Sequence, residues 1–300
     1  MIASATTTIV EFPNLGWGPW TLRRYLVRDL FGHLSIAIYG AIICVAILIA
    51  CAVILRFAKK KEGIDTESML DYFLFCIPIG VIGARVMYVA SKWDQYRSFG
   101  EMIAIWHGGI AIYGAIIFGA LTVLVLARVK KHSLLAVYDS IIPGLLIAQA
   151  IGRWGNFVNG EAYGASIVPD LLWGMTVNGY GPVHPTFLYE SLITFTGFLL
   201  VVFVLYPRKK FNGEIFCFYL MWYGVGRTLV EGLRGDSLMI GPLRLAQCIG
   251  VLSAVAGLIL LFILALREKK RRMVEAPKET SPAQASAKNK ESENQDGADH

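Results

Sequence analysis

The chain has 300 residues, of which 55% are hydrophobic and only 17% are charged, and its mean hydropathy is +0.55. This composition excludes an ordinary soluble globule, and repeated apolar runs of about 20 residues indicate a polytopic α-helical membrane protein. The net charge of +6 comes from short basic clusters beside apolar runs, so we expect anionic lipid headgroups and not nucleic acid as their partner.

Residues 1–32 precede the first apolar run. Trp17, Trp20 and Arg23 lie beside leucines, a composition that suits a segment lying on the membrane surface, and a plain loop fits nearly as well. We therefore predict an external N-terminal segment that is partly interfacial.

Seven apolar runs follow, and together they predict an all-α fold with about seven transmembrane helices. The runs are 34–56, 69–90, 108–127, 133–151, 187–206, 213–232 and 243–266. The fourth run is the most polar of them, since it carries Asp139, Pro143 and Gln149. All five cysteines fall inside these runs without a CxxC pair, so we expect small buried hydrophobes and not disulfides or metal ligands.

Basic residues cluster after every second apolar run. The clusters are at 56–61, 128–131, 208–210 and 267–272. The positive-inside rule places these four loops in the cytoplasm, and the N-terminus and the intervening loops outside. The three arginines of the N-terminal segment oppose this orientation mildly, and four concordant loops outweigh them.

The predicted membrane domain covers residues 33–267. From Met273 the composition changes to Lys, Glu, Ser, Ala, Asn and Gln with almost no apolar residues. This change predicts a disordered cytoplasmic tail over 268–300.

A charged and amide-rich stretch with four glycines, residues 152–164, follows the fourth run. Arg153, Asn156, Glu161 and Gly164 lie within it. Polar groups at the end of a spanning helix are costly in lipid, so we predict a functional site here.

The sixth run carries a polar face. Tyr223, Arg227, Glu231 and Arg234 are spaced so that they share one side of a helix. An Arg227–Glu231 pair that only joins helices is one interpretation, and an anion site is the other, because Arg offers a donor fork that matches phosphate. Since Arg153 and Arg227 come from runs that end on the same side, we predict a polar cavity that opens outward and holds a lipid phosphate.

Four further segments bring polar groups into apolar surroundings. Residues 184–190 fit either a capped helix start or a contribution to the cavity. Tyr39 and Tyr113 each lie beside a glycine, and a buried phenol needs a partner. Arg85, within the second run, fits a structural ion pair and a headgroup contact equally well. The sequence shows no metal, Walker or GxSxG motif, so we predict no metal and no cofactor.

The assembled motifs resemble those of the bacterial phosphatidylglycerol–prolipoprotein diacylglyceryl transferase family. The run Gly-Arg-x-Gly-Asn-Phe-x-Asn-x-Glu stands at 152–161, His-Pro-x-x-x-Tyr-Glu at 184–190, and Tyr-Gly-x-x-Arg-x-x-x-Glu-x-x-Arg at 223–234. The resemblance covers roughly residues 30–265. It implies an enzyme of the bacterial cytoplasmic membrane with two substrates, phosphatidylglycerol and a preprolipoprotein signal peptide. The diacylglyceryl group would pass to the lipobox cysteine thiol, with release of glycerol 1-phosphate as the first step of lipoprotein maturation.

The resemblance also implies the residues of the site. The implied catalytic residues are Arg153, Arg227, Tyr39, Tyr113, Asn156 and Glu231. The implied phosphatidylglycerol-binding residues are Arg153, Asn156, Glu161, Gly164, Tyr223, Arg227 and Arg234. Many family members have His where this chain has Tyr113, and a phenol is a poor base at neutral pH. We therefore interpret Tyr113 as a hydrogen-bond donor or positioning group.

Two other classes of function compete with this one. An anion transporter could line a pore with Arg153 and Arg227, although the cytoplasmic halves of the runs show few polar residues. A different phospholipid-headgroup enzyme would consume phosphatidylglycerol without a cysteine-bearing peptide.

Overall fold

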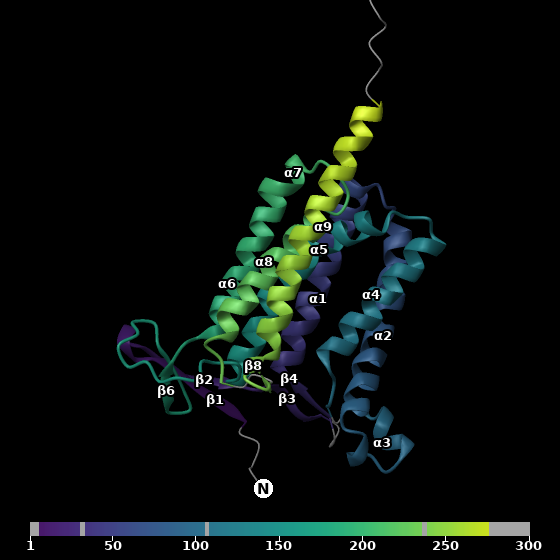
Figure 1. Ribbon diagram of the computed structural model, residues 1–300. Helices are drawn as coiled ribbons and strands as arrows, with labels where there is room; N and C mark the ends of the chain where they lie inside the picture. Colours follow the sequence, from purple (N-terminus) through teal and green to yellow (C-terminus); the bar gives the residue numbers. More distant parts are fainter. Residues whose placement is uncertain (1–5, 31–33, 106–107, 236–238, 276–300) are drawn as a thin grey trace, which may run out of the picture. The chain divides into compact units, whose positions relative to one another are not determined.

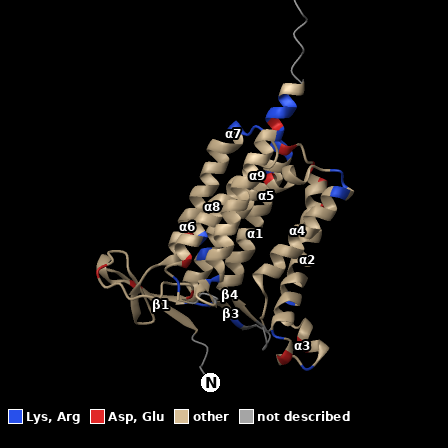
Figure 2. Ribbon diagram, in the orientation of Figure 1, with Lys and Arg blue, Asp and Glu red and all other residues tan. Residues whose placement is uncertain are grey.

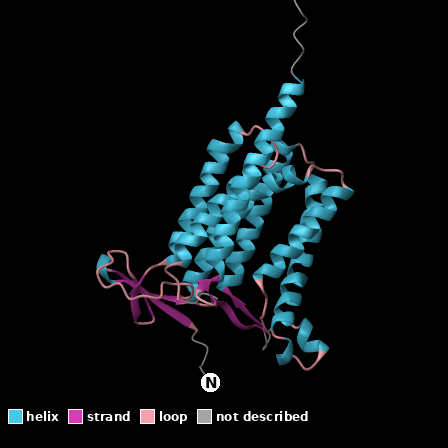
Figure 3. Cartoon of the chain, viewed as in Figure 1, coloured by secondary structure: helices cyan, strands magenta, loops and turns pink. Residues whose placement is uncertain are grey.

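The computed structural model describes residues 6–30, 34–105, 108–235 and 239–275. By contact the chain divides into two units, Met1–Leu261 and Phe262–His300. The first unit holds a bundle of long helices with short strands gathered at one end of them (Figures 1 and 3). The predicted disordered tail begins within α9 (Leu245–Glu275), which continues to Glu275, and its remainder lies outside the described residues.

Six helical segments in the described part are long and apolar enough to cross a membrane. They are Ile38–Glu62, Thr66–Ser91, Ile112–Val129, Leu134–Asn159, Thr186–Arg208 and Leu245–Val274. The first comprises α1 (Ile38–Phe57) and a π-helical turn, and the next three are α2 (Thr66–Ser91), α4 (Ile112–Val129) and α5 (Leu134–Asn159). The fifth comprises α6 (Thr186–Leu200), a second π-helical turn and α7 (Tyr206–Arg208).

The remaining predicted run, 213–232, forms α8 (Glu214–Glu231). Its 18 residues include three charged ones, Glu214, Arg227 and Glu231, and it is not among those six segments. A short helix, α3 (Phe99–Ile103), lies in the connection between α2 and α4. The prediction of a mostly helical polytopic protein is thus confirmed.

The prediction of an all-α fold is wrong for the segments between the helices. The described residues contain β1 (Thr7–Phe12), β2 (Trp17–Arg23), β3 (Tyr25–Leu30), β4 (Leu34–Ala37), β5 (Met175–Val177), β6 (Tyr180–Val183), β7 (Met239–Ile240) and β8 (Leu243–Arg244). β1 pairs with both β2 and β5, so one antiparallel sheet has the order β2-β1-β5-β6. The N-terminal segment that we expected on the membrane surface or as a loop is therefore half of a sheet whose other half comes from residues 175–183.

This sheet has its own small core. Val10 pairs with Trp20 on one side and with Val177 on the other, and Val10 itself is completely buried. Val10 and Val177 pack with Phe187 at the start of α6. The sheet therefore holds the loop before α6 against the helix ends.

Helices pack closely where glycines face a neighbour. A methyl group on Gly114 of α4 would lie 2.2 Å from the carbonyl oxygen of Gly83 in α2, and one on Gly224 of α8 would lie 2.4 Å from that of Gly250 in α9. Small residues at such crossings are typical of helix pairs in membranes.

The start of α2 is capped by a side chain. α2 begins at the N-cap Asp65, whose carboxylate accepts a hydrogen bond from the Ser68 amide at 2.7 Å, and this bond lowers the pKa of Asp65.

Basic residues lie at the helix ends away from the strands, at α7 and beyond α4 (Figure 2). There Lys209 contacts Glu62 at 2.6 Å and Asp139 at 2.8 Å. The carboxylate of Asp139 also accepts hydrogen bonds from the amides of Gly213 and Phe216 at the start of α8. Asp139, which makes the fourth run unusually polar, thus joins α5 to α8 at the end opposite the strands.

Candidate functional site

Glu190, in the second turn of α6, is the centre of a cluster of charged side chains. Its carboxylate contacts Arg153 of α5, Arg227 of α8 at 2.7 Å, and Arg234 just after α8 at 3.4 Å. The Glu190 side chain is 7% exposed and the three arginine side chains are between 12% and 25% exposed. Three elements distant in the sequence therefore converge on one buried carboxylate, where Figure 2 shows acidic and basic residues near the end of α8 and the start of α6.

Arg153 belongs to the last two turns of α5 and connects the cluster to the loop that follows. It donates to Asn156 Oδ1 at 3.4 Å, and Asn156 Nδ2 donates to Glu161 Oε1 at 3.0 Å. α5 ends at Gly160, which has a left-handed backbone with φ of 63°. This turn brings Glu161 back beside Asn156.

The end of α8 supplies the other half of the cluster. Arg227 contacts Glu231 of the following turn at 2.6 Å as well as Glu190, so one guanidinium bridges two buried carboxylates. Arg244 of β8 donates to the Glu231 carbonyl oxygen. The predicted Arg227–Glu231 pair is present, and it belongs to a network wider than a simple link between helices.

Two of the three predicted tyrosines, Tyr39 and Tyr113, lie at helix starts, and Tyr223 lies near the middle of α8. The ring of Tyr39 in α1 packs on Gly155, where a methyl group would lie 2.6 Å from its Cδ2. Tyr113 is the second residue of α4. Tyr223 stacks on Tyr219 with ring centroids 5.5 Å apart.

The loop after α5 forms a wall of this region. Gly164 makes an isolated β-bridge with Arg234, and its amide donates to the His184 carbonyl oxygen at 2.9 Å. A methyl group on Gly164 would lie 2.9 Å from His184 Cβ, so only glycine fits this crossing. A pocket of about 490 Å³ is lined by residues 160–165, Tyr180 and Gly235. The predicted site residues lie at the helix ends beside the strands or in the adjoining loops, except for Tyr223, which lies near the middle of α8.

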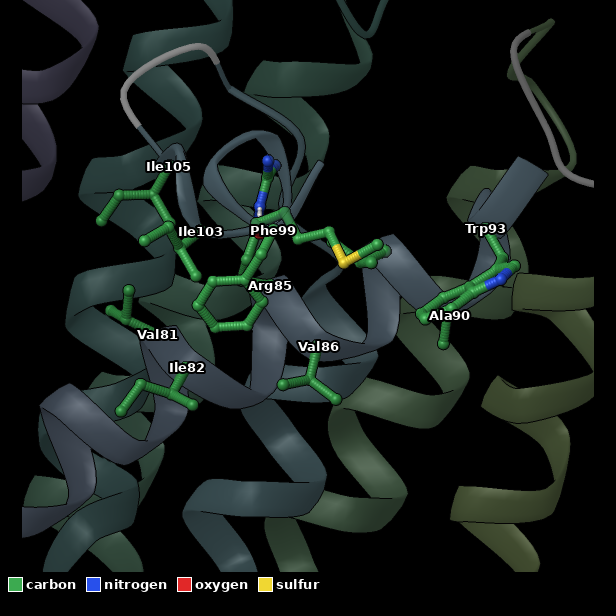
Figure 4. A pocket seen from close by; sticks show the side chains of 11 residues that line it. Val81, Ile82, Arg85, Val86, Ala90, Trp93, Phe99, Ile103 and Ile105 are labelled. Atoms are coloured by element: carbon green, nitrogen blue, oxygen red, sulfur yellow. Dashed lines mark hydrogen bonds between the residues drawn. The ribbon is translucent and has the colours of Figure 1, made fainter. Parts of the chain in front are cut away.

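Within the described residues, Arg85 of α2 contacts backbone carbonyl groups and not the carboxylate of an ion pair. Its guanidinium donates at 2.7–2.8 Å to four backbone carbonyl oxygens, those of Glu101, Met102, Gly108 and Gly109. It therefore holds the α2–α4 connection in place. Beside it, apolar side chains of α2 and of the α3 segment line a pocket of about 460 Å³ (Figure 4).

Glu190 is the residue that our sequence analysis undervalued. We left 184–190 open between a helix start and a contribution to the cavity, and we did not include Glu190 among the site residues. The available signal was an excess of charge, because the three arginines Arg153, Arg227 and Arg234 outnumber the two predicted carboxylates, those of Glu161 and Glu231.

The cluster can bind a phosphate group. Guanidinium groups offer paired donors that match phosphate oxygens, and in an environment with little water such contacts are stronger than at a surface. Three guanidinium groups against the carboxylates of Glu190 and Glu231 leave one positive charge. Among the described residues, no group of three or more His, Cys, Asp or Glu side chains is placed to hold a metal ion.

Comparison with known proteins gives one consistent result. The model of the family described as prolipoprotein diacylglyceryl transferase matches residues 26–263. A phosphatidylglycerol–prolipoprotein diacylglyceryl transferase of Finegoldia magna is 44% identical over 233 residues, which are 77% of this chain and 92% of that protein. Proteins of the same name from Listeria welshimeri and Streptococcus agalactiae are 43% and 40% identical over 238 residues, covering 76% and 77% of this chain and 85% and 92% of theirs.

Proposed function

Because this chain belongs to the prolipoprotein diacylglyceryl transferase family, we propose that its arginine cluster transfers a diacylglyceryl group from phosphatidylglycerol to the lipobox cysteine of a preprolipoprotein. The observation that carries the proposal is the convergence of Arg153, Arg227 and Arg234 on Glu190 at the ends of apolar helices. A phosphodiester at the membrane surface is a suitable ligand for guanidinium groups held in this way.

The nucleophile is the thiolate of the substrate, so the enzyme needs no nucleophile of its own. The sulfur attacks the carbon of the diacylglycerol unit that is esterified to the phosphate. A carbon–sulfur bond forms as the bond between this carbon and the phosphate ester oxygen breaks. The electron pair leaves with glycerol 1-phosphate, and the thiol proton passes to water or to the leaving phosphate. Negative charge grows on the phosphate during this step, and Arg153 and Arg227 stabilise it.

The neighbouring side chains position these groups. Glu190 and Glu231 hold the guanidinium planes, and Asn156 orients Arg153. The Glu161 carboxylate accepts a hydrogen bond from a hydroxyl of the glycerol headgroup, and Gly164 lets the backbone approach the lipid closely. Arg234 and Tyr223 complete the phosphate and headgroup contacts.

The tyrosines have a secondary role in this mechanism. Tyr113 donates a hydrogen bond to the reacting groups, and the surrounding positive field favours thiolate formation. Tyr39 packs on Gly155 and fixes the face of α5 that carries Arg153 and Asn156.

We assign the protein to the bacterial cytoplasmic membrane with α8 as a seventh span. The N-terminus and the arginine cluster lie outside, and the basic loops and the C-terminus lie in the cytoplasm. A membrane-impermeant thiol reagent added to intact spheroplasts should label Asp170→Cys and leave Lys60→Cys unlabelled, since both positions are exposed, Asp170 in a loop and Lys60 in the π-helical turn that ends the first segment. The reverse pattern would invert the orientation.

The function is tested with purified protein, phosphatidylglycerol and a lipobox peptide. Mass spectrometry should detect a diacylglyceryl adduct on the peptide cysteine. The adduct should disappear with Arg153→Ala and with Arg227→Ala while both proteins remain folded. Arg128→Ala, at the basic end of α4, is the matched control and should retain activity.

Other outcomes identify the competing functions. Loss of phosphatidylglycerol that does not depend on the peptide cysteine would indicate a different headgroup enzyme. Flux of glycerol phosphate into proteoliposomes without lipid turnover would indicate a transporter.

A further inference from the structure

The N-terminal hairpin of β1 and β2 contacts the C-terminal end of α5, the helix that carries Arg153 and Asn156. Arg24, directly after β2, makes this contact: its Nε donates to Thr8 Oγ1 at 3.0 Å and its Nη2 donates to the Asn159 carbonyl oxygen at 2.8 Å. Asn159 is the last residue of α5. Carbonyl groups at a helix C-terminus lack partners within the helix, and a cation there also complements the helix dipole.

The backbone of Arg24 is fixed at both sides. Its amide donates to the Thr6 carbonyl oxygen, and its carbonyl oxygen accepts from the amide of Ile38, each at 2.9 Å. Thr8 is completely buried. The backbone of Arg24 is therefore held in position by the hairpin and by the start of α1. The entropy cost of the contact with Asn159 is limited to ordering the Arg24 side chain.

The turn after α5 is packed against the same strand. Gly160 has a φ of 63°, and a methyl group on it would lie 2.5 Å from Thr8 Cγ2 and 3.0 Å from Val177 Cγ1. β1 and β5 therefore leave room for glycine alone at this turn, and the turn cannot shift toward the sheet.

This turn leads directly to Glu161. Glu161 Oε1 accepts from Asn156 Nδ2 at 3.0 Å and from Asn159 Nδ2 at 3.4 Å, and the Glu161 amide donates to the Asn156 carbonyl oxygen at 3.0 Å. A continuous set of contacts thus runs from Arg24 through residues 159–161 to Asn156, which accepts from Arg153.

We propose that Arg24 is a positioning residue for the lipid headgroup: by binding the last carbonyl of α5 it holds Glu161 and Asn156 in place beside Arg153. Arg24 lies before residue 26, where the match to the family model begins. The inference rests on the proposed function, because its readout is the Michaelis constant for phosphatidylglycerol.

The test compares Arg24→Ala with Arg23→Ala in the full-length enzyme. Arg23 is its neighbour in the chain and is exposed at the end of β2, so it is a matched control for charge. Loss of one charge-assisted hydrogen bond should raise the KM for phosphatidylglycerol about fivefold to tenfold in Arg24→Ala, with kcat and the KM for the peptide within about twofold. Arg24→Lys keeps the positive charge and loses the guanidinium donors that reach both Thr8 and Asn159, so its KM for phosphatidylglycerol should be intermediate. Arg23→Ala should have the wild-type KM.

A double-mutant cycle with Glu161→Gln separates positioning from a general structural effect. Glu161→Gln should raise the KM for phosphatidylglycerol, and Arg24→Ala should then add less than about a twofold further increase. Equal effects of Arg24→Ala in both backgrounds, a Glu161→Gln enzyme with wild-type KM, or an Arg23→Ala enzyme as impaired as Arg24→Ala would each overturn the proposal. If Arg24→Ala does not fold, Thr8→Val takes its place in the cycle with the same outcomes. If the wild-type enzyme forms no diacylglyceryl adduct on the peptide cysteine, the proposed function itself is contradicted, and the role of Arg24 falls with it.

Discussion

A single carboxylate, that of Glu190, keeps three guanidinium groups together inside a bundle of apolar helices. Burying this many charges is costly, and the arrangement is tolerated because each guanidinium has an acidic partner within contact distance. Removing one partner destabilises the protein by more than the intact ion pair stabilises it, since the remaining charge stays buried without a counter-charge.

We therefore expect Glu190→Gln to destabilise the protein by about 3–5 kcal/mol and to abolish transfer. The substitution keeps the shape of the side chain and removes its charge, so Arg153 loses its carboxylate partner and Arg227 keeps only Glu231. Thermal unfolding in detergent measures the change, and Glu67→Gln, at an exposed position in the first turn of α2, should leave the unfolding temperature unchanged. Wild-type stability of Glu190→Gln would mean that the cluster does not depend on its central carboxylate.

The hydroxyl of Tyr113 can be tested separately from its ring. Tyr113→Phe should lower turnover about tenfold, as expected for the loss of one hydrogen bond to a reacting group, without a change in the unfolding temperature. Tyr138→Phe removes a hydroxyl that donates to the Ala120 carbonyl oxygen away from the cluster, and it should keep wild-type turnover. Full turnover of Tyr113→Phe would eliminate an essential role for the hydroxyl.

At the scale of helices, glycines decide how closely the elements approach. α2 and α4 are in contact through Gly83 and Gly114, and the backbone of one helix occupies the place that a side chain of the other would need. Gly119, one and a half turns further along α4, has open space around it. The same residue type therefore has two different roles on one helix.

This difference gives a matched pair of substitutions. Gly114→Ala should destabilise the protein by about 1–3 kcal/mol, because its methyl group meets the Gly83 carbonyl group. Gly119→Ala should be neutral or stabilising by up to about 1 kcal/mol, because alanine favours the helix and meets no neighbour. The comparison is made by thermal unfolding in the same detergent, and equal effects of the two would contradict the packing described for α2 and α4.

At the scale of the bundle, two networks of charges lie at opposite ends. One is the arginine cluster, and the other joins Lys209, Glu62 and Asp139. Asp139 is completely buried and also accepts from two amides at the start of α8, so it links α5, α7 and α8 far from the proposed chemistry. We therefore expect the second network to support the fold without contacting the substrates.

Asp139→Ala should therefore destabilise the protein by about 3–5 kcal/mol, while the enzyme that remains folded at low temperature keeps its KM for phosphatidylglycerol. Asp71→Ala removes the partner of Lys130 in a partly exposed ion pair at 2.6 Å, and its effect should stay below about 1 kcal/mol. A changed KM in Asp139→Ala would show that the two ends of the bundle are coupled.

Much of this architecture could be predicted from the sequence, because apolar runs and basic loops report directly on helices in a membrane. Arg153, Arg227 and Glu231 could also be found, since charges within apolar runs are conspicuous. The sheet could not be predicted: β1 pairs with β5 across about 165 residues, and no local pattern records such pairing. The partners of Arg85 escaped prediction for a related reason, because they are backbone carbonyl groups that every residue possesses.

The single positive charge left over in the arginine cluster has a consequence for product release. A phosphodiester carries one negative charge and neutralises the cluster, whereas the phosphate monoester formed by transfer carries about 1.5–2 negative charges at neutral pH. The product therefore brings more charge than the site can balance and is better solvated by water than by the enzyme. Glycerol 1-phosphate should accordingly inhibit the enzyme only weakly, and its inhibition constant should fall as the pH is lowered toward 5; a constant that does not change with pH would refute this account.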